Sequence, residues 1–204
     1  MSQVLSVAKE LLKLSLSGDE KAPLTVLRLQ KLLYYAQAWS SIVRESELFS
    51  DELQAWRHGP VVPAVHRTLA DGEEVHSIRA DALAIVPDLS AEEAEFVRRV
   101  WEAYGQYSAL QLSTMTCAEM PWRKAWGDRP KDGCGDDAIA LVDLEEFFGT
   151  QAMPASLAEY RHELRKREKE AERELAELPP LEIDQLTAGA SSFTPAARRV
   201  LDRG

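Results

Sequence analysis

The segment over residues 24–40, LTVLRLQKLLYYAQAWS, most constrains how this chain can fold. Its apolar residues recur at positions 29, 32, 33, 36 and 39, a spacing that predicts a helix with a wide apolar stripe. Such a helix is stable in water only when other elements cover it on more than one side. We therefore predict a core built around this helix. Its buried members include Leu29, Leu33, Tyr35 and Trp39.

Capping signals and apolar spacing divide most of the remaining chain into short helices. Thr25 is the expected N-cap of the central helix, and Ser90 and Ser108 each begin a capping-box pattern. Asp143 is the expected cap of a later short helix. The predicted helices cover residues 3–16, 25–40, 63–69, 90–105, 108–117 and 143–149.

Residues 48–62 interrupt this helical pattern. Residues 53–56 alternate enough for a short strand, and Gly59-Pro60 predicts a turn directly after it. The predicted fold class is therefore mainly α: a compact helical domain with a small β element, followed by a long C-terminal helix. We assign residues 1–150 to the domain, and residues 151–204 to a charged helix over 157–178 and a flexible tail.

Composition weighs against several classes of protein. The chain has 24 Lys and Arg against 34 Asp and Glu, and its net charge of -10 disfavours a protein that tracks phosphates, although a regulatory DNA-binding protein stays open. No apolar stretch reaches the roughly 20 residues of a membrane span. Charged residues interrupt the apolar pattern of the N-terminus, unlike a signal peptide. We expect a cytoplasmic protein without a membrane partner.

The sequence contains no recognised catalytic or metal-binding motif. A glycine-rich phosphate loop, a His-Glu-x-x-His motif and a Cys-x-x-Cys pair are all missing, and the spacing of histidines and cysteines matches no familiar zinc pattern. We therefore expect no cofactor and no metal. The enzymatic alternative is a hydrolase-like protein that uses His58, Cys117 and Glu119.

The run Trp56-Arg57-His58-Gly59-Pro60 is the most distinctive candidate for a binding surface. Tryptophan and arginine are the residue types that most often anchor protein interfaces, and the Gly-Pro pair constrains the backbone beside them. A tight turn whose tryptophan packs in the core explains the same residues. Both interpretations stay open at this point.

An acidic run is the second candidate surface. Six acids and no base lie between Asp132 and Glu146. The run fits a solvated loop with favourable charge at a helix N-terminus, and the alternative is a docking patch for a basic partner.

Three segments, in this order, resemble the Panacea domain family of SocA-like antitoxins, many of which are phage- or island-encoded. They are LTVLRLQKLLYYAQAWS (24–40), LFSDELQAWRHGPVVPAVHRTL (48–69) and TMTCAEMPWRKAW (114–126), and the resemblance spans roughly residues 5–150. Arg28 stands where the family commonly has Lys, His66 where an aromatic hydroxyl is usual, and Cys117 where His is usual. The family-motif residues are Thr25, Gln30, Lys31, Tyr34, Tyr35, Trp56, Gly59, Pro60, Thr116, Glu119, Pro121 and Trp122.

The resemblance implies a binding protein and not an enzyme, namely an antitoxin that binds and neutralises a cognate toxin protein. It also implies a second partner, ClpX of the ClpXP protease, because the SocA member acts as a proteolytic adaptor for its toxin. The motif residues are expected to build the shared scaffold. The partner-binding surface is expected at Trp56, Arg57, His58, Gly59 and Pro60.

Overall fold

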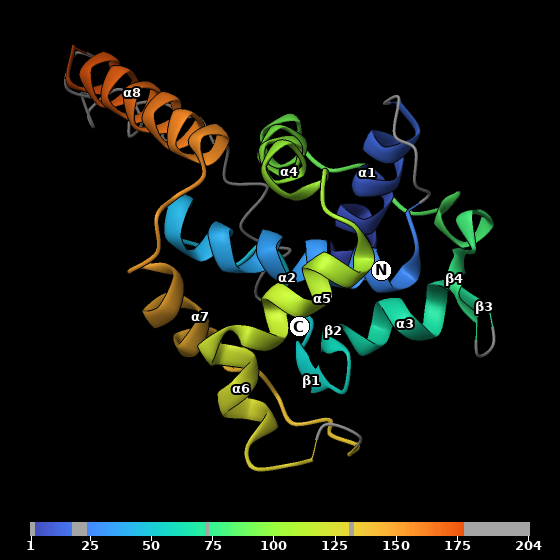
Figure 1. The fold of residues 1–204 in the computed structure, drawn as a ribbon. Helices are drawn as coiled ribbons and strands as arrows, with labels where there is room; N and C mark the ends of the chain where they lie inside the picture. The colour runs from blue at the N-terminus through green and yellow to red at the C-terminus, as the bar shows by residue number, and fades with distance from the viewer. Residues whose placement is uncertain (1–2, 18–23, 72–73, 131–132, 178–204) are drawn as a thin grey trace, which may run out of the picture. The chain divides into compact units, whose positions relative to one another are not determined.

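The structure is a computed structural model, which describes residues 3–17, 24–71, 74–130 and 133–177. Over these residues the fold is mainly α, as predicted, with eight helices and two two-stranded antiparallel sheets (Figure 1). The helices are α1 (Gln3–Ser17), α2 (Val26–Val43), α3 (Pro63–Leu69), α4 (Ala91–Tyr104), α5 (Ala109–Ala118), α6 (Met120–Trp126), α7 (Leu141–Phe148) and α8 (Ala155–Glu177). The strands are β1 (Gln54–Trp56), β2 (Gly59–Val61), β3 (Ala70–Asp71) and β4 (Glu74–Ile78), and a single-turn helix covers Ala80–Leu83.

The chain divides into two compact units, residues 1–164 and residues 165–204. In the first unit, the beginning of α8 is anchored by Leu157 and Tyr160, both buried, and by the Ser156 hydroxyl, which donates to the carbonyl of Arg99 at 2.9 Å. In the second unit, the side chains described over residues 165–177 are exposed. The predicted tail lies outside the described residues, and the domain boundary at residue 150 stays a prediction.

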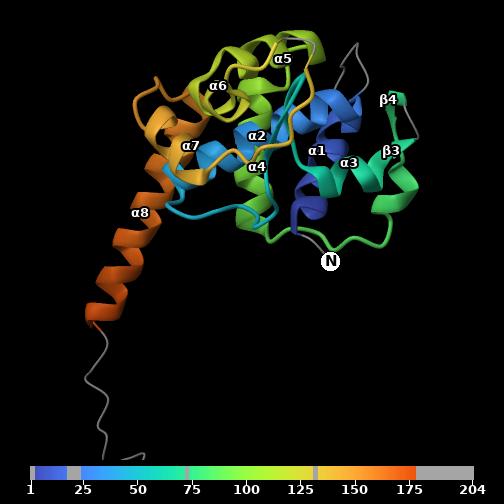
Figure 2. The same cartoon turned by 90° about the horizontal axis from the view of Figure 1, so that it is seen from below.

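Helix α2 is the centre of the first unit. It contacts α1, α3, α4, α5, α7 and β2, and the first two figures show α1, α4, α5 and α7 around it (Figures 1 and 2). Every side chain over residues 28–40 is buried, so the helix is covered on all sides. The predicted burial of the central helix is therefore confirmed, including that of Leu29, Leu33, Tyr35 and Trp39.

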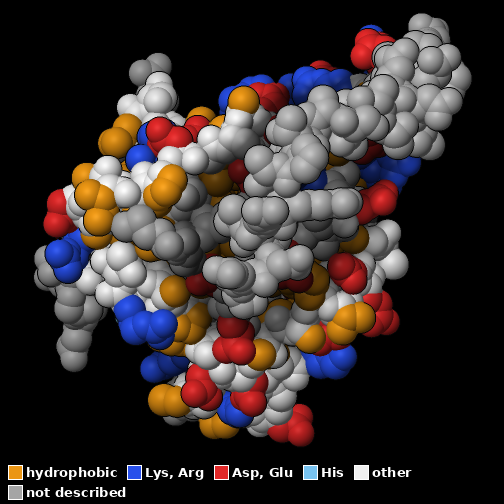
Figure 3. Space-filling model, turned by 180° about the vertical axis from the view of Figure 1, so that it is seen from behind, with side chains coloured by type: hydrophobic (Ala, Val, Ile, Leu, Met, Phe, Trp, Pro, Cys, Tyr) orange, Lys and Arg blue, Asp and Glu red, His pale blue; other side chains and the backbone are white. Residues whose placement is uncertain are grey.

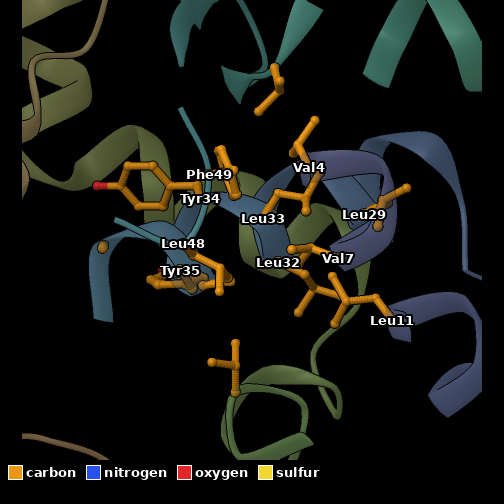
Figure 4. Packing of buried hydrophobic residues seen from close by; sticks show 14 of the residues in the cluster. Val4, Val7, Leu11, Leu29, Leu32, Leu33, Tyr34, Tyr35, Leu48 and Phe49 are labelled. Atoms are coloured by element: carbon orange, nitrogen blue, oxygen red, sulfur yellow. The ribbon is translucent and has the colours of Figure 1, made fainter. Parts of the chain in front are cut away.

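Helix α1 and the segment after α2 complete the core around this helix. Val4, Val7 and Leu11 of α1 are each 0% exposed, and Figure 4 shows them beside the leucines of α2. Leu48 and Phe49, which follow α2 in the chain, lie beside its tyrosines in the same view (Figure 4). Helix α2 thus receives apolar side chains from segments on both sides of it in the sequence.

Four predicted helix caps can be compared with the structure, and three of them are correct. The Thr25 hydroxyl accepts from the backbone N–H of Arg28 at 3.2 Å, and capping boxes begin at Ser90 and Ser108. The prediction for Asp143 is wrong, because α7 begins at Leu141 and places this residue inside its first turn. A carboxylate there still suits the positive end of the helix dipole, which explains why the sequence resembles a cap.

The small β element predicted near residues 48–62 is the hairpin of β1 and β2, and this prediction is confirmed. Trp56 pairs with Gly59, so the chain reverses at Arg57 and His58. The prediction that Gly59-Pro60 forms the turn is therefore wrong by two positions. Gly59 instead begins β2 with a φ of 100°, a backbone conformation that glycine adopts without steric strain.

Charged side chains of both signs share the surface of the molecule. On the face in Figure 3, acidic and basic side chains alternate with apolar ones. Helix α4 contributes one such cluster, in which Arg98 and Arg99 pair with Glu95 and Glu102. None of the described helices has both the length and the apolar character needed to cross a membrane.

Candidate protein-binding site

The β1–β2 hairpin is held by side chains from three helices. The backbone carbonyl oxygens of residues 56, 58, 60 and 62 each accept a hydrogen bond from one of these side chains. The donors, in that order, are Trp122 Nε1 at 3.0 Å, Ser113 Oγ at 2.7 Å, Lys31 Nζ at 2.9 Å and Gln30 Nε2 at 3.3 Å. Because α2, α5 and α6 supply these donors, the hairpin has a fixed position on the helical core.

Gly59 and Gln30 bring the hairpin close to the helices. A Cβ atom at Gly59 would lie 2.8 Å from Thr116 Oγ1 and 2.9 Å from Lys31 Cε, so a larger residue would require these side chains or the hairpin to shift. The Gln30 amide also accepts from the backbone N–H of Val62 at 2.7 Å, which gives it two bonds to one residue. That these motif residues build the scaffold of the domain stays a prediction. The contacts of Gly59 and Gln30 support it.

Lys31 is the most deeply buried charged side chain of the hairpin support. It is 0% exposed, and its ammonium group donates to the carbonyl of Pro60. Removal of the charged form from water lowers the pKa of Lys31 to about 7, and nearby Cys117 only partly offsets this effect. The ammonium group therefore stabilises the hairpin through one bond but carries a desolvation cost.

Glu119 links α2 to the beginning of α6. Its two carboxylate oxygens accept from the hydroxyls of Tyr34 and Tyr35, each at 2.8 Å. Burial raises the pKa of Glu119, against the opposite effect of the two hydroxyl donors. Burial and the Glu119 charge also raise the pKa values of both tyrosines, so the hydroxyls stay protonated donors. These three motif residues thus form a closed internal contact.

The hairpin tip is the exposed part of this arrangement. Arg57 and His58 are exposed, while Trp56 is half-buried with its ring 5.1 Å from that of His66. The Trp56 indole N–H donates to Gln54 Oε1 at 2.9 Å. The structure therefore has features of a tight turn with a packed tryptophan and also of a binding surface. The backbone is fixed and Trp56 is partly covered, while the cationic tip beside it is exposed.

A groove opens beside this tip. It has a volume of about 1010 Å³ and lies along α5, α6 and the loop that follows α6. Trp122 and Trp126 stack on each other at its wall, with ring centroids 5.1 Å apart. Its other lining side chains are Arg57, Ser113, Thr114, Cys117, Ala118, Met120, Arg123, Lys124, Asp128 and Arg129.

The enzymatic alternative receives little support from this geometry. None of the hydrogen bonds among the described residues joins His58, Cys117 and Glu119. Burial raises the pKa of the Cys117 thiol, whereas a nucleophilic cysteine requires a lowered value. Both oxygens of Glu119 accept bonds from tyrosines, and His58 lies at the exposed hairpin tip. Among the described residues, no cluster of His, Cys, Asp and Glu is placed to hold a metal ion.

Cys117 is expected to react more slowly with an alkylating reagent than Cys134. Cys117 is half-buried with a raised thiol pKa, while Cys134 is exposed. Because only the thiolate reacts, we expect a difference of about tenfold or more in rate. The measurement is alkylation of Cys134→Ser and Cys117→Ser, each of which keeps a single thiol. Equal rates would contradict this description of the Cys117 environment.

The acidic run is partly engaged within the chain. Asp143 accepts from Lys124 Nζ at 2.6 Å, and Asp137 pairs with Arg129. Asp132 lies outside the described residues. The remaining acids of the run, which are Asp136, Glu145 and Glu146, are exposed. A docking role for this run stays a prediction.

Two residues of the site have no signal in the sequence. Ser113 lies inside α5, and its bond to the His58 carbonyl joins residues 55 positions apart. Arg123 lines the groove, but an arginine in a short helix resembles any solvated charge. Only the fold, which places α5 and α6 against the hairpin, shows what these side chains contact.

The described residues thus form a helical scaffold that presents a fixed hairpin and an adjoining groove. Residues 29–123, from α2 into α6, match the family model described as "Antitoxin SocA-like, Panacea domain", and the predicted family resemblance is confirmed. A curated relative, Antitoxin SocA of Caulobacter vibrioides (strain NA1000 / CB15N), is 32% identical over 110 residues. The match covers 49% of this chain and 58% of that relative, little more than half of its length. No solved structure matches the chain.

Proposed function

We propose that this protein is an antitoxin that binds a cognate toxin protein directly and neutralises it. The family match supports this function, because residues 29–123 contain both the hairpin and the greater part of the groove. The observation that carries the proposal is the set of four side-chain bonds to the hairpin carbonyls. A surface fixed in this way loses little conformational entropy when a partner binds.

The proposed recognition surface is the hairpin, with different roles for its residues. Arg57 and His58 are exposed at the tip and are available to a partner. Trp56 contributes a half-buried apolar side chain beside them. Gly59 and Pro60 are buried, so their role is to hold the backbone and not to contact the toxin.

A non-enzymatic role is the simplest account of the motif side chains. Glu119, Lys31 and Gln30 each bond to a side chain or carbonyl within the chain. Neutralisation is therefore proposed to follow from binding alone. The deciding experiment is co-expression with the protein encoded by the adjacent gene. Restored growth supports the antitoxin function, while toxicity that persists at full expression of this chain excludes it for that pair.

Arg57→Ala is expected to weaken toxin binding by more than about 1 kcal/mol, the usual level for an interface anchor. Thermal stability should change little, because Arg57 is exposed and no ion pair of the described residues holds it. Titration calorimetry with the adjacent gene's product gives the affinity. The matched control is Arg67→Ala, an exposed arginine of α3. An affinity unchanged by Arg57→Ala would exclude the hairpin tip as a recognition anchor.

Delivery of the toxin to a ClpXP-type protease is a separate part of the proposal. Neutralisation by binding does not require it, so the two roles can be tested independently. Purified toxin, protease and ATP are incubated with and without this chain. Faster toxin degradation in its presence supports an adaptor role, while unchanged degradation by an active protease leaves sequestration as the mechanism.

A further inference from the structure

We infer that the groove along α5 and α6 binds an acidic segment of the partner protein that also carries an apolar side chain. This inference rests on the proposed function, since it specifies which surface of a toxin this protein recognises. It combines three observations: the charge of the groove lining, the partners of its cations, and the apolar side chains in the same lining.

The groove is basic although the chain is acidic. The net charge of the whole chain is -10, but the groove lining has more cations than acids. Among the residues that the structure describes, the lining cations are Arg57, Arg123, Lys124 and Arg129, and the one lining acid is Asp128. At physiological salt the Debye length is about 8 Å, so a bound segment responds mainly to the charges that line the groove.

Two of the four cations are already engaged. Lys124 pairs with Asp143 at 2.6 Å, and Arg129 pairs with Asp137. Asp143 belongs to α7, and Asp137 belongs to the loop before it. These cations therefore contribute to the local potential but have carboxylate partners within the chain.

Arg57 and Arg123 have no ion pair or hydrogen bond from their side chains among the described residues, and both are exposed. They line the same groove from different elements, the hairpin tip and α6. A partner carboxylate can bind either guanidinium without breaking an existing pair. Arginine also binds carboxylates in a two-point geometry, which favours an acidic partner group.

Apolar side chains share the groove lining with these cations. Met120 and Cys117 are half-buried in the groove, and Ala118 beside them is exposed. The stacked Trp122 and Trp126 are only 8% and 5% exposed, and they give the groove a rigid wall. An apolar side chain of the partner can displace water here while its acids reach the arginines. Such a combination of a central apolar contact and charged edges is typical of protein interfaces.

The chemistry favours a protein segment over a nucleic acid. A nucleic acid presents a regular series of phosphates and requires an extended basic track. Within the described part of the chain, this groove offers two cations without internal partners, and the net charge of -10 would repel the rest of a polyanion. A protein segment needs only one or two acids at the right positions.

Charge reversal tests the inference with the adjacent gene's product as the probe. Arg57→Glu and Arg123→Glu are each expected to raise the Kd by at least about tenfold, and Arg67→Glu on α3 is the control. Raised salt should weaken the wild-type complex more than the variant complexes. A toxin variant with one Asp or Glu changed to Lys should restore affinity for Arg123→Glu. Circular dichroism verifies that each variant is folded.

Alkylation of Cys117 provides a second readout that does not depend on these variants. In Cys134→Ser, Cys117 is the one remaining thiol and lies in the groove. A saturating amount of toxin should slow its alkylation by at least about tenfold, because a bound segment covers the thiol. Protection should be lost when the toxin carries the Lys substitution that weakens wild-type binding.

The outcomes separate the groove from the proposed function. The groove inference is overturned if both charge-reversal variants bind the toxin with wild-type affinity, or if Cys117 in the saturated complex is alkylated as fast as in the free chain. The antitoxin function stands in either case. Absence of toxin binding by the wild-type chain overturns the function, and the groove inference with it. The inference would also be overturned, in favour of a nucleic-acid site, if the wild-type chain binds an oligonucleotide and Arg123→Glu abolishes that binding.

Discussion

Leu33→Ala is expected to lower the free energy of unfolding by about 2–5 kcal/mol. Leu33 is 0% exposed and lies near the middle of α2, where Figure 4 shows it close to Val4 and Phe49. Truncation removes the transfer free energy of the lost carbons and also leaves a cavity. Val4 belongs to α1, which packs against α2, and Phe49 belongs to the segment after α2, so these neighbours cannot simply collapse into the space. Urea unfolding followed by circular dichroism measures the change.

The matched control is Leu110→Ala, which removes the same atoms from a surface position. Leu110 is 76% exposed in the first turn of α5, so its truncation should change the free energy of unfolding by less than about 0.5 kcal/mol. A comparable decrease in the free energy of unfolding for both variants would mean that α2 is not the centre of the core. A loss confined to Leu33→Ala would support the packing around α2.

The burial of α2 could be predicted only in part from its sequence. Periodicity identified the apolar stripe that includes Leu29 and Leu33, because apolar residues on one helical face must avoid water. The opposite face carries Gln30, Lys31 and Gln37, which periodicity assigns to solvent. These side chains are buried because each bonds to backbone groups of distant segments, residues 60–62 and 48–49. No local pattern encodes such contacts.

The hairpin shows the same division between local and distant information. The strand has a local signal, which predicts residues 53–56 where the structure has Gln54–Trp56, and Gly59 has one as well. The position of the turn was missed because a glycine suits a close approach of the backbone to other groups as well as it suits a turn. The structure assigns Gly59 the close approach, since Thr116 and Lys31 leave no room for a side chain. That crowding depends on α5, which is about 50 residues further along the chain.

The hairpin part of the candidate site could be predicted from the sequence, but the groove beside it could not. The sequence identified Trp56 and Arg57 by their chemistry, and Arg57 is exposed in the structure. The groove could not be predicted, because it is formed by α5, α6 and the hairpin tip together. Arg123 becomes a candidate only in the folded chain, because Arg57 and Arg123 are far apart in the sequence but line the same groove. For this reason, local sequence patterns cannot predict a surface that separate elements form together.

Lys31 leads to the second large expected effect, a dependence of stability on pH. Burial lowers the pKa of Lys31 to about 7 in the folded chain, from an ordinary value of 10.5. Between these two values the unfolded chain binds a proton that the folded chain has released. Stability therefore rises with pH above about 7, by up to about 1.4 kcal/mol per pH unit. Below that pH both states bind the proton, and the full cost of burying the ammonium ion is present.

The difference between wild type and Lys31→Met isolates this contribution. Urea unfolding between pH 7 and about pH 8.5 avoids the range in which thiols and phenols of the unfolded chain lose most of their protons. We expect the wild-type free energy of unfolding to rise across this interval and the Lys31→Met value to rise much less. Lys166→Met removes a lysine that is exposed on α8 and should keep the wild-type slope. Parallel slopes for all three proteins would show that the Lys31 ammonium group is hydrated in the folded state. The bond to the Pro60 carbonyl would then not be the buried support that positions the hairpin.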